Sequence, residues 1–405
     1  SSNGLEKRPK LRFPEFKEPY RSARLGEIAV LINRTDPKSA APIMMLSAGN
    51  GFIMQSDKYS RYNAGQSLKK YILLKKGELA YNHGASKAKQ FGCCYELLED
   101  EALIPYVYHC FKVDKNEYTP YVAFLLNNPK IDRQLKRLVS SSARMDGLLN
   151  ISFKDYMSIN LSLPPYAEQK QVSDFIKRID ERIVIQEQLI SSLKKYKRGV
   201  IQHIFRSHAK TDEKSKWTYV RLGDIFKKVS RRNSNGEIKN VITNSAEYGL
   251  IPQRDFFDKD IAVDGNTTNY YVIEYGDFVY NPRKSRTAPY GPCNRYTLRD
   301  KGIISPLYTC LVLQSDINPS YLAWYFKSDA WYRYIYDNGS QGVRHDRVSM
   351  TDDLLMSIPV ILPNKKRQQK IADMLDMIES KLHMVQQEYE FLLQIKDGCM
   401  QQLFI

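Results

Sequence analysis

The sequence lacks the local patterns that bind metals, phosphates or membranes. Its six cysteines form no Cys-x-x-Cys pair, and its six histidines form no HxxxH or HExxH arrangement. There is no GxxxxGK[ST] phosphate loop, and Asn281-Pro282-Arg283 lacks the second proline and the aromatic residue of an amino-methyltransferase signature. No apolar run approaches the roughly 20 residues that span a bilayer. These absences predict a cytoplasmic protein with no membrane segment, no metal site and no catalytic centre of its own.

The sequence also has fewer acidic than basic residues. The chain carries 61 Lys and Arg against 45 Asp and Glu, which leaves a net charge of +16 over 405 residues. A positive surplus favours a polyanionic partner, because neutralising phosphate groups releases condensed counterions. A basic soluble protein without a nucleic-acid role is the alternative that charge alone leaves open. The length exceeds one ordinary domain and predicts two or three.

What is present, above all, is an internal repeat. Arg24-Leu25-Gly26-Glu27-Ile28 recurs 197 residues later as Arg221-Leu222-Gly223-Asp224-Ile225. Gly77-Glu78-Leu79-Ala80-Tyr81-Asn82 recurs 199 residues later as Gly276-Asp277-Phe278-Val279-Tyr280-Asn281. Such a period is far longer than that of a solenoid repeat, so a whole domain is duplicated. Cys110 and Cys310 occupy matched places in apolar strands, which predicts core residues rather than nucleophiles.

Each half ends in a heptad pattern. After Pro164 and Pro363, apolar residues step by alternating three and four positions, which indicates a coiled coil. Gln186, Lys197 and Lys396 interrupt this seam, and the two lysines are equivalent positions of the repeat. They either set the register of the coil or extend into solvent near its ends. The predicted seam contains Val172, Ile176, Ile179, Ile183, Ile190, Leu193, Ile371, Leu375, Ile378, Leu382, Val385 and Leu392.

The expected architecture is α/β, of the α+β kind, with two tandem globular domains. Each domain is followed by a long helix, and the two helices form an antiparallel coiled coil with pseudo-two-fold symmetry. Within the domains, stretches 120–138 and 319–336 read as helices that begin at proline. The expected boundaries are a tail at 1–23, a first domain at 24–163, a central helix at 164–206, a linker at 207–217, a second domain at 218–362 and a final helix at 363–405.

Two polar loops recur in both halves and are the candidate contacts to DNA. Their Asn, Arg, Lys and Ser side chains are of the types that reach base edges and phosphates, and small residues let backbone amides approach a phosphate. Ordinary solvated loops are the competing interpretation. The candidate residues are Asn82, His83, Ser86, Lys87, Lys89, Ser141, Ser142, Arg144, Asn281, Arg283, Lys284, Arg286, Ser340, Gln341, Arg344 and His345.

The repeated unit resembles half of a type I restriction-modification specificity subunit. The resemblance rests on a Leu-Gly-(Glu/Asp)-Ile strand, a Gly-(Glu/Asp)-x-x-Tyr-Asn strand and a closing Pro-x4-Gln-x2-(Val/Ile) coil, and it spans about residues 11–405. Arg367 departs from the acidic residue found at Glu168. The resemblance implies that each domain is a target-recognition domain for one half of a split, asymmetric double-stranded DNA site.

The resemblance also implies partners and cofactors. The helices would set the spacing of the half-sites and dock two modification (methyltransferase) subunits, and restriction subunits would translocate and cut DNA. S-adenosylmethionine, ATP and Mg would be bound by those partners, and no cofactor by this chain, which is then a non-catalytic subunit. Three rival interpretations are a stand-alone two-module DNA-binding regulator, a coiled-coil scaffold and a metal-dependent nuclease.

Overall fold

The computed structural model describes residues 8–58, 65–87, 89–139, 149–206, 217–256, 267–339 and 346–405. It divides into two compact units. Unit 1 comprises Ser1–Glu187 with Glu388–Ile405, and unit 2 comprises Gln188–Gln387. Each unit therefore holds one copy of the duplicated domain together with part of both long helices.

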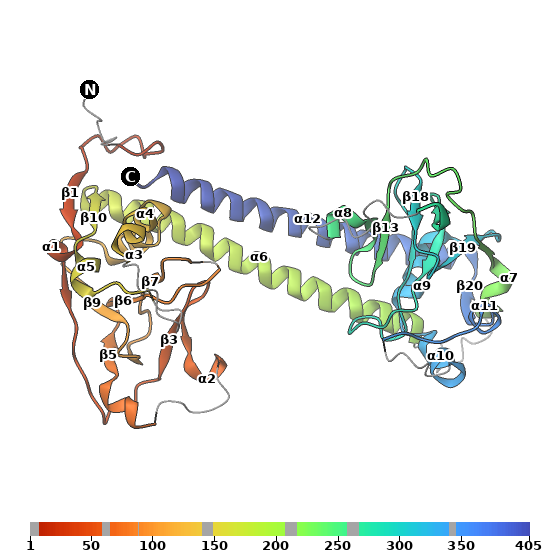
Figure 1. Ribbon diagram of the computed structural model, residues 1–405, viewed down its shortest axis with the longest axis horizontal. Coiled ribbons are helices and arrows are strands. Elements are labelled where there is room, and N and C mark those ends of the chain that lie inside the picture. The colour runs from red at the N-terminus through yellow and green to blue at the C-terminus, as the bar shows by residue number, and fades with distance from the viewer. Residues whose placement is uncertain are drawn as a thin grey trace. The chain divides into compact units, whose positions relative to one another are not determined.

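Unit 1 is built on a four-stranded antiparallel sheet in the order β2-β9-β6-β7, flanked by three two-stranded pairs, β3-β4, β5-β8 and β1-β10 (Figure 1). Its strands are β1 (Arg21–Arg24), β2 (Ala29–Leu31), β3 (Met44–Ser47), β4 (Gly51–Met54), β5 (Ile72–Lys75), β6 (Leu79–Asn82), β7 (Cys93–Glu96), β8 (Glu101–Ile104), β9 (His109–Val113) and β10 (Asn160–Leu163). Its helices are α1 (Leu25–Ile28), α2 (Gln55–Lys58), α3 (Thr119–Leu126), α4 (Pro129–Leu138), α5 (Phe153–Met157) and the start of α6 (Tyr166–Arg206), with a 3-10 turn at Gly65–Lys70.

Unit 2 repeats this topology strand for strand, with the sheet β12-β19-β16-β17 and the pairs β13-β14, β15-β18 and β11-β20. Its strands are β11 (Trp217–Arg221), β12 (Phe226–Val229), β13 (Ile242–Ser245), β14 (Gly249–Pro252), β15 (Tyr271–Ile273), β16 (Phe278–Tyr280), β17 (Cys293–Arg295), β18 (Gly302–Ile304), β19 (Thr309–Leu313) and β20 (Pro359–Pro363). Its helices are α7 (Leu222–Ile225), α8 (Gln253–Phe256), α9 (Pro319–Lys327), α10 (Tyr332–Asn338), α11 (Asp352–Met356) and the start of α12 (Lys365–Gln402), with a 3-10 turn at Thr267–Asn269.

The repeated Leu-Gly-(Glu/Asp)-Ile motif is a single helical turn, and its prediction as a strand was wrong. In α1 the backbone N–H of Arg24 donates to the Glu27 carboxylate at 2.8 Å, and in α7 that of Arg221 donates to Asp224 at 2.9 Å. An acidic residue three positions on captures a backbone donor that the short helix leaves unpaired. This capping favours the turn over an extended chain.

The two cysteines at equivalent positions of the repeat are core residues, as predicted. Cys110 lies on β9 and Cys310 on β19, with exposed fractions of 0% and 1%. Each belongs to the apolar cluster on its sheet. Burial raises the pKa of both thiols to about 12, because the thiolate is poorly solvated there.

The two long helices pack against each other in antiparallel orientation. In unit 1, Asp180 and Gln186 of α6 contact Lys396 and Glu388 of α12, so the residue numbers run in opposite directions along the two helices. In unit 2, α6 and α12 contribute to one core through residues that include Ile201. Every predicted seam residue is buried or half-buried, which is the packing that a heptad pattern requires.

Several predicted boundaries shift. The helices expected at 120–138 and 319–336 are each broken in two. Pro129 cannot continue α3 because it lacks an N–H, and Asn128 caps α4 instead by accepting from the Lys130 N–H at 3.0 Å. The predicted tail at 1–23 includes most of β1. Trp217, which was predicted to belong to the linker, is the first residue of β11. The remainder of that linker, 207–216, lies outside the described residues.

Candidate nucleic-acid interface

The first candidate loop follows β6 in unit 1 and β16 in unit 2, and in both a strand-ending asparagine shapes it. The Asn82 side-chain oxygen accepts from the Gly84 N–H, and that of Asn281 accepts from the Arg283 N–H, both at 2.9 Å. The Asn281 amide also donates to the Asn244 carbonyl at 3.2 Å. These side-chain amides form turns within the protein, so Asn82 and Asn281 stabilise the conformation of the loop.

Equivalent serine side chains stabilise the later part of this loop in both units. The Ser86 hydroxyl accepts from the Lys89 N–H at 3.1 Å, and the Ser285 hydroxyl accepts from the Ala288 N–H at 3.0 Å. The loops then return through glycines with positive φ, Gly92 at +83° and Gly291 at +82°. A side chain there would meet the carbonyl oxygen of the strand-ending asparagine at less than 3.0 Å, so only glycine fits.

The structure brings the ends of the second candidate loop against the first. The Leu149 N–H donates to the His83 carbonyl at 2.9 Å, and the equivalent Val348 N–H donates to the Pro282 carbonyl at 2.9 Å. The Lys284 N–H donates to the Asp346 carbonyl at 2.8 Å. The second loop itself lies outside the described residues, and with it the candidates Ser141, Ser142, Arg144, Ser340, Gln341, Arg344 and His345.

His83 is held by the protein rather than presented to solvent. Its Nδ1 lies 2.7 Å from the Leu149 carbonyl and its Nε2 lies 2.8 Å from the Val107 carbonyl. The ring stacks on His109 with a centroid distance of 5.2 Å. Burial lowers the pKa of His109, because the imidazolium is poorly solvated there. Both rings therefore position the base of the loop.

The candidate cations divide by exposure. Lys89 is half-buried and its ammonium donates to the Asn127 carbonyl at 2.8 Å, which ties the loop to the end of α3. Lys284 is also half-buried. Exposed side chains remain at Lys87 in unit 1 and at Arg283 and Arg286 in unit 2. These three cations are the ones that the described structure leaves available for a phosphate or a base edge.

An arginine that was not predicted as a functional residue forms an ion pair beside the strand before each loop. Arg34 pairs with the buried Glu78 at 2.5 Å, and the equivalent Arg231 pairs with the buried Asp277. The same carboxylates accept backbone N–H groups from Lys75 and Glu274, at 2.7 and 2.9 Å. The offset of 197 residues between the arginines was the signal that could have identified them.

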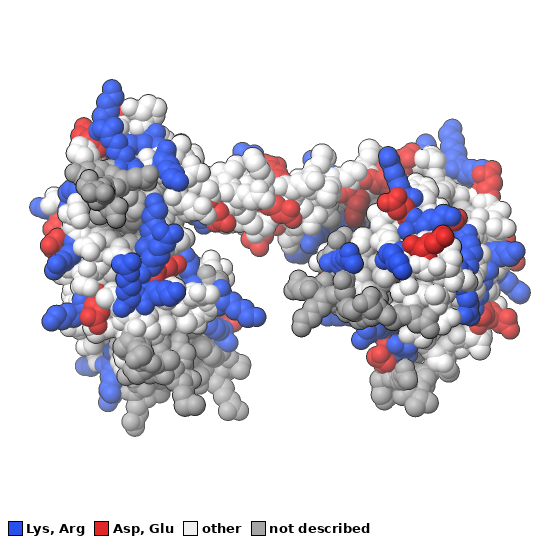
Figure 2. Space-filling view, turned by 45° about the horizontal axis from the view of Figure 1, so that its top comes forward, with Lys and Arg blue, Asp and Glu red and all other residues white. Residues whose placement is uncertain are grey.

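The basic surplus lies on the surface of both units. Figure 2 shows Lys and Arg side chains outnumbering Asp and Glu on the visible face of each unit. Fixed positive charge of this kind attracts a polyanion before any specific contact forms.

Residues 214–393 match the family model described as the type I restriction modification DNA specificity domain. This stretch, which makes up most of unit 2, therefore carries the DNA specificity domain of type I restriction-modification systems. The description of that family model names DNA specificity as the role of the domain.

Two solved structures share the fold over almost the entire chain. The type I restriction-modification S subunit from M. genitalium is 14% identical with a TM-score of 0.55, and the match covers 98% of this chain and 99% of that one. A chain from a study of complex assembly and conformational transition in the type I R-M system is 15% identical with a TM-score of 0.56, covering 96% and 98%. At these identities the likeness establishes the specificity-subunit fold.

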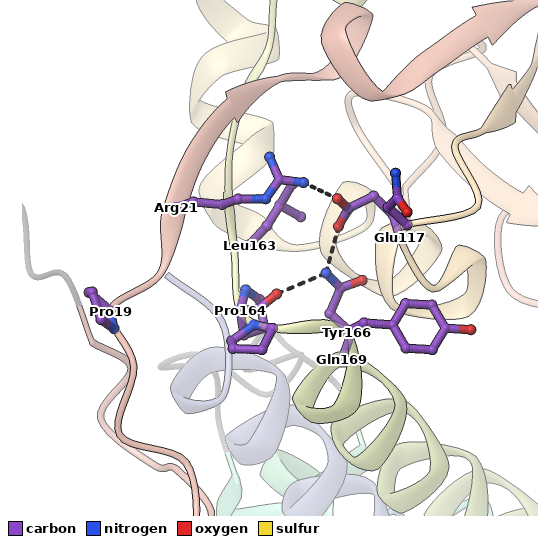
Figure 3. Close-up of a pocket in the computed structure, with 9 residues that line it drawn as sticks. Pro19, Arg21, Glu117, Leu163, Pro164, Tyr166 and Gln169 are labelled. Carbon is purple, nitrogen blue, oxygen red and sulfur yellow. Dashed lines mark hydrogen bonds and ion pairs between the residues drawn. The ribbon is translucent and has the colours of Figure 1, made fainter.

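The glutamine of the family motif joins each long helix to its domain. In unit 1, the Gln169 amide donates to the buried Glu117 at 2.6 Å and to the Pro164 carbonyl at 2.9 Å, and Arg21 pairs with Glu117 (Figure 3). These residues line a pocket of about 170 Å³. In unit 2, Gln368 donates to the Pro363 carbonyl at 2.8 Å. The motif glutamine therefore has a structural role in both units.

The residue before this glutamine differs between the copies. Glu168 is fully buried and accepts two bonds from Arg12, at 2.9 and 2.7 Å, and one from the Tyr20 hydroxyl at 3.0 Å. Its counterpart Arg367 instead lies over the Trp217 ring, 5.2 Å from the centroid. The same position is thus an ion pair in unit 1 and a cation–π contact in unit 2.

Helix α12 carries a second apolar stripe that was not predicted from the sequence. On α12, Met377, Met384 and Phe391 recur every seven residues and are 66%, 60% and 60% exposed. Residues seven apart share a helix face, so these three side chains form one exposed apolar line along α12.

The described residues contain no cluster of three His, Cys, Asp or Glu side chains arranged to hold a metal. Within the same part of the chain, no helix has the length and apolar character needed to cross a membrane.

Proposed function

We propose that each unit reads one half of a split, asymmetric DNA target. The supporting observation is a loop of the same construction in both units that carries different exposed cations, Lys87 in unit 1 and Arg283 with Arg286 in unit 2. A shared scaffold presents each loop to DNA in a similar way, and the different side chains select different bases. Basic side chains also supply sequence-independent affinity for phosphates.

The long helices set the spacing between the half-sites and dock two modification subunits. The apolar stripe Met377, Met384 and Phe391 supports the docking, because a helix of a partner could cover it. Restriction subunits then join this complex. S-adenosylmethionine binds to the modification subunits, and ATP and Mg bind to the restriction subunits.

A methylation map tests the proposal. The chain is co-expressed with a modification subunit encoded beside it, in a host that lacks adenine methylation, and the DNA is sequenced for methyladenine. We expect a split, asymmetric motif with one modified adenine in each half. A soluble complex that methylates nothing would contradict the proposal and favour a stand-alone regulator or a scaffold.

Removing the exposed arginines of unit 2 is expected to weaken DNA binding. The double variant Arg283→Ala with Arg286→Ala should lower the affinity of the assembled complex. The slope of log K against log salt should become shallower by about one for each phosphate group that the protein no longer neutralises. The measurement is fluorescence anisotropy of labelled duplex DNA at several salt concentrations.

A matched control separates this effect from net charge. The double variant Lys195→Ala with Lys381→Ala removes two exposed cations from α6 and α12, outside the loops, and should leave the slope unchanged. An equal change in both variants would remove Arg283 and Arg286 from the phosphate contacts.

A further inference from the structure

The polar residues that interrupt the coiled-coil seam have charged partners on the opposite helix. In unit 2, the Lys197 ammonium of α6 lies 2.6 Å from the Glu379 carboxylate of α12. In unit 1, the Lys396 ammonium of α12 lies 2.6 Å from the Asp180 carboxylate of α6. The lysine side chains are 22% and 35% exposed, so neither simply extends into solvent.

The two ion pairs are copies of each other under the duplication. Lys396 follows Lys197 by 199 residues, and Glu379 follows Asp180 by the same 199. On each helix the lysine consequently follows the acid by 17 positions, 180 to 197 on α6 and 379 to 396 on α12. Because these spans are equal, one antiparallel register satisfies both pairs.

A slip of the helices would separate the pairs. Sliding by one heptad keeps apolar residues in the seam but sets Lys197 opposite Ala372 or Gln386 instead of Glu379. A half-buried lysine would then lose its acid partner, and an unpaired charge at such a position is costly. The apolar seam alone repeats every seven residues, so it does not distinguish these registers.

Unit 1 adds a contact that has no copy in unit 2. The buried Gln186 donates to Glu388 at 2.8 Å, and Arg182 donates to the same carboxylate at 2.8 Å. The counterparts of Gln186 and Glu388 in the repeat are Val385 and Leu189, both apolar. This polar contact therefore distinguishes the part of the coil in unit 1 from the equivalent part in unit 2.

We propose that the pairs Lys197–Glu379 and Lys396–Asp180 hold α6 and α12 in a single register and so fix the spacing of the two DNA half-sites. A one-heptad slip moves the helices by about 10 Å, which corresponds to about three base pairs of B-DNA. The register part depends only on the coil, whereas the spacing part rests on the proposed function.

Spin-label distances in the full-length chain test the register. Labels on Ser191→Cys and Ser380→Cys report on exposed positions of α6 and α12 in unit 2, and all six native cysteines are buried. The unaltered pairs should give one narrow distance. Lys197→Met with Lys396→Met keeps an apolar seam that can fold, and it should add a population displaced by about 10 Å.

Exchanging the charges provides the rescue. The variant Lys197→Glu, Glu379→Lys, Lys396→Glu, Asp180→Lys should return to a single narrow distance, and the control Lys195→Glu, at an exposed lysine on α6, should never lose it. The register part is overturned if the methionine variant keeps the single distance, or if the exchanged variant stays mixed.

Methylation in the co-expressed complex tests the spacing part separately. The methionine variant should methylate less at the native spacing, and the exchanged variant should return to the level of the unaltered chain. If the labels show mixed registers while methylation at the native spacing is undiminished, the spacing part is overturned and the register part stands. If the unaltered chain supports no methylation, the proposed function fails, and the label distances still decide the register.

Discussion

Replacing Glu168 by alanine should lower the free energy of unfolding of unit 1 by about 3–5 kcal/mol, the usual cost of breaking a buried ion pair. Glu168 is fully buried, and Arg12, which donates two bonds to it, is only 11% exposed. Without the carboxylate, the Arg12 guanidinium and the Tyr20 hydroxyl lose their acceptor in an environment that solvates them poorly. Hydrogen exchange along the first turns of α6 measures the loss within unit 1.

The duplication supplies the control for this variant. Arg367→Ala changes the equivalent position in unit 2, where the contact is a cation–π interaction with Trp217, and should cost about 0.5–1 kcal/mol. Equal losses in the two variants would mean that the Glu168–Arg12 pair contributes no more than the contact that replaces it.

Alanine at Gly291 should destabilise unit 2 strongly. The φ angle of +82° alone costs an L-residue about 1–3 kcal/mol, and a Cβ would also collide with the Asn281 carbonyl. That obstacle is backbone, so relief requires the loop to move. Chemical denaturation of the full chain should show a loss above this range. In the assembled complex we expect weaker methylation, because the recognition loop of unit 2 is displaced.

Gly276→Ala separates strain from collision. Gly276 has a φ of +96°, but no atom lies within 4 Å of its added Cβ. This variant should show the conformational cost alone, about 1–3 kcal/mol, with the loop unmoved. If Gly276→Ala proves as damaging as Gly291→Ala, the close approach of the Asn281 carbonyl does not shape the loop.

The sequence predicted the duplicated architecture well, because short motifs recur in the same order in both halves and the heptads are local patterns. The buried Cys110 and Cys310 also followed from the apolar strands around them. The prediction of secondary structure failed where one short segment has features of both a strand and a helix. The Leu-Gly-(Glu/Asp)-Ile motif has the apolar residues of a strand, yet the cap from Glu27 makes it a helical turn.

The candidate DNA contacts were predicted by residue type, and residue type does not reveal which groups are already satisfied. Asn82, Asn281 and His83 are polar and follow a strand, but their polar atoms bond within their own unit. Lys87 and Arg286 share that description and are exposed. Distinguishing them requires the neighbouring loops, which come from elsewhere in the chain.

The sequence by itself therefore determined the two equivalent domains, the two long helices with their seam, and the excess of positive charge. These properties depend on composition, on the spacing of residues a few positions apart, and on short motifs that recur about 199 residues later. Tertiary structure alone decided that Glu168 meets Arg12, that Leu149 closes onto His83, and that Lys197 faces Glu379. Each of these contacts joins residues tens to hundreds of positions apart, and packing, rather than local propensity, selects which distant groups meet.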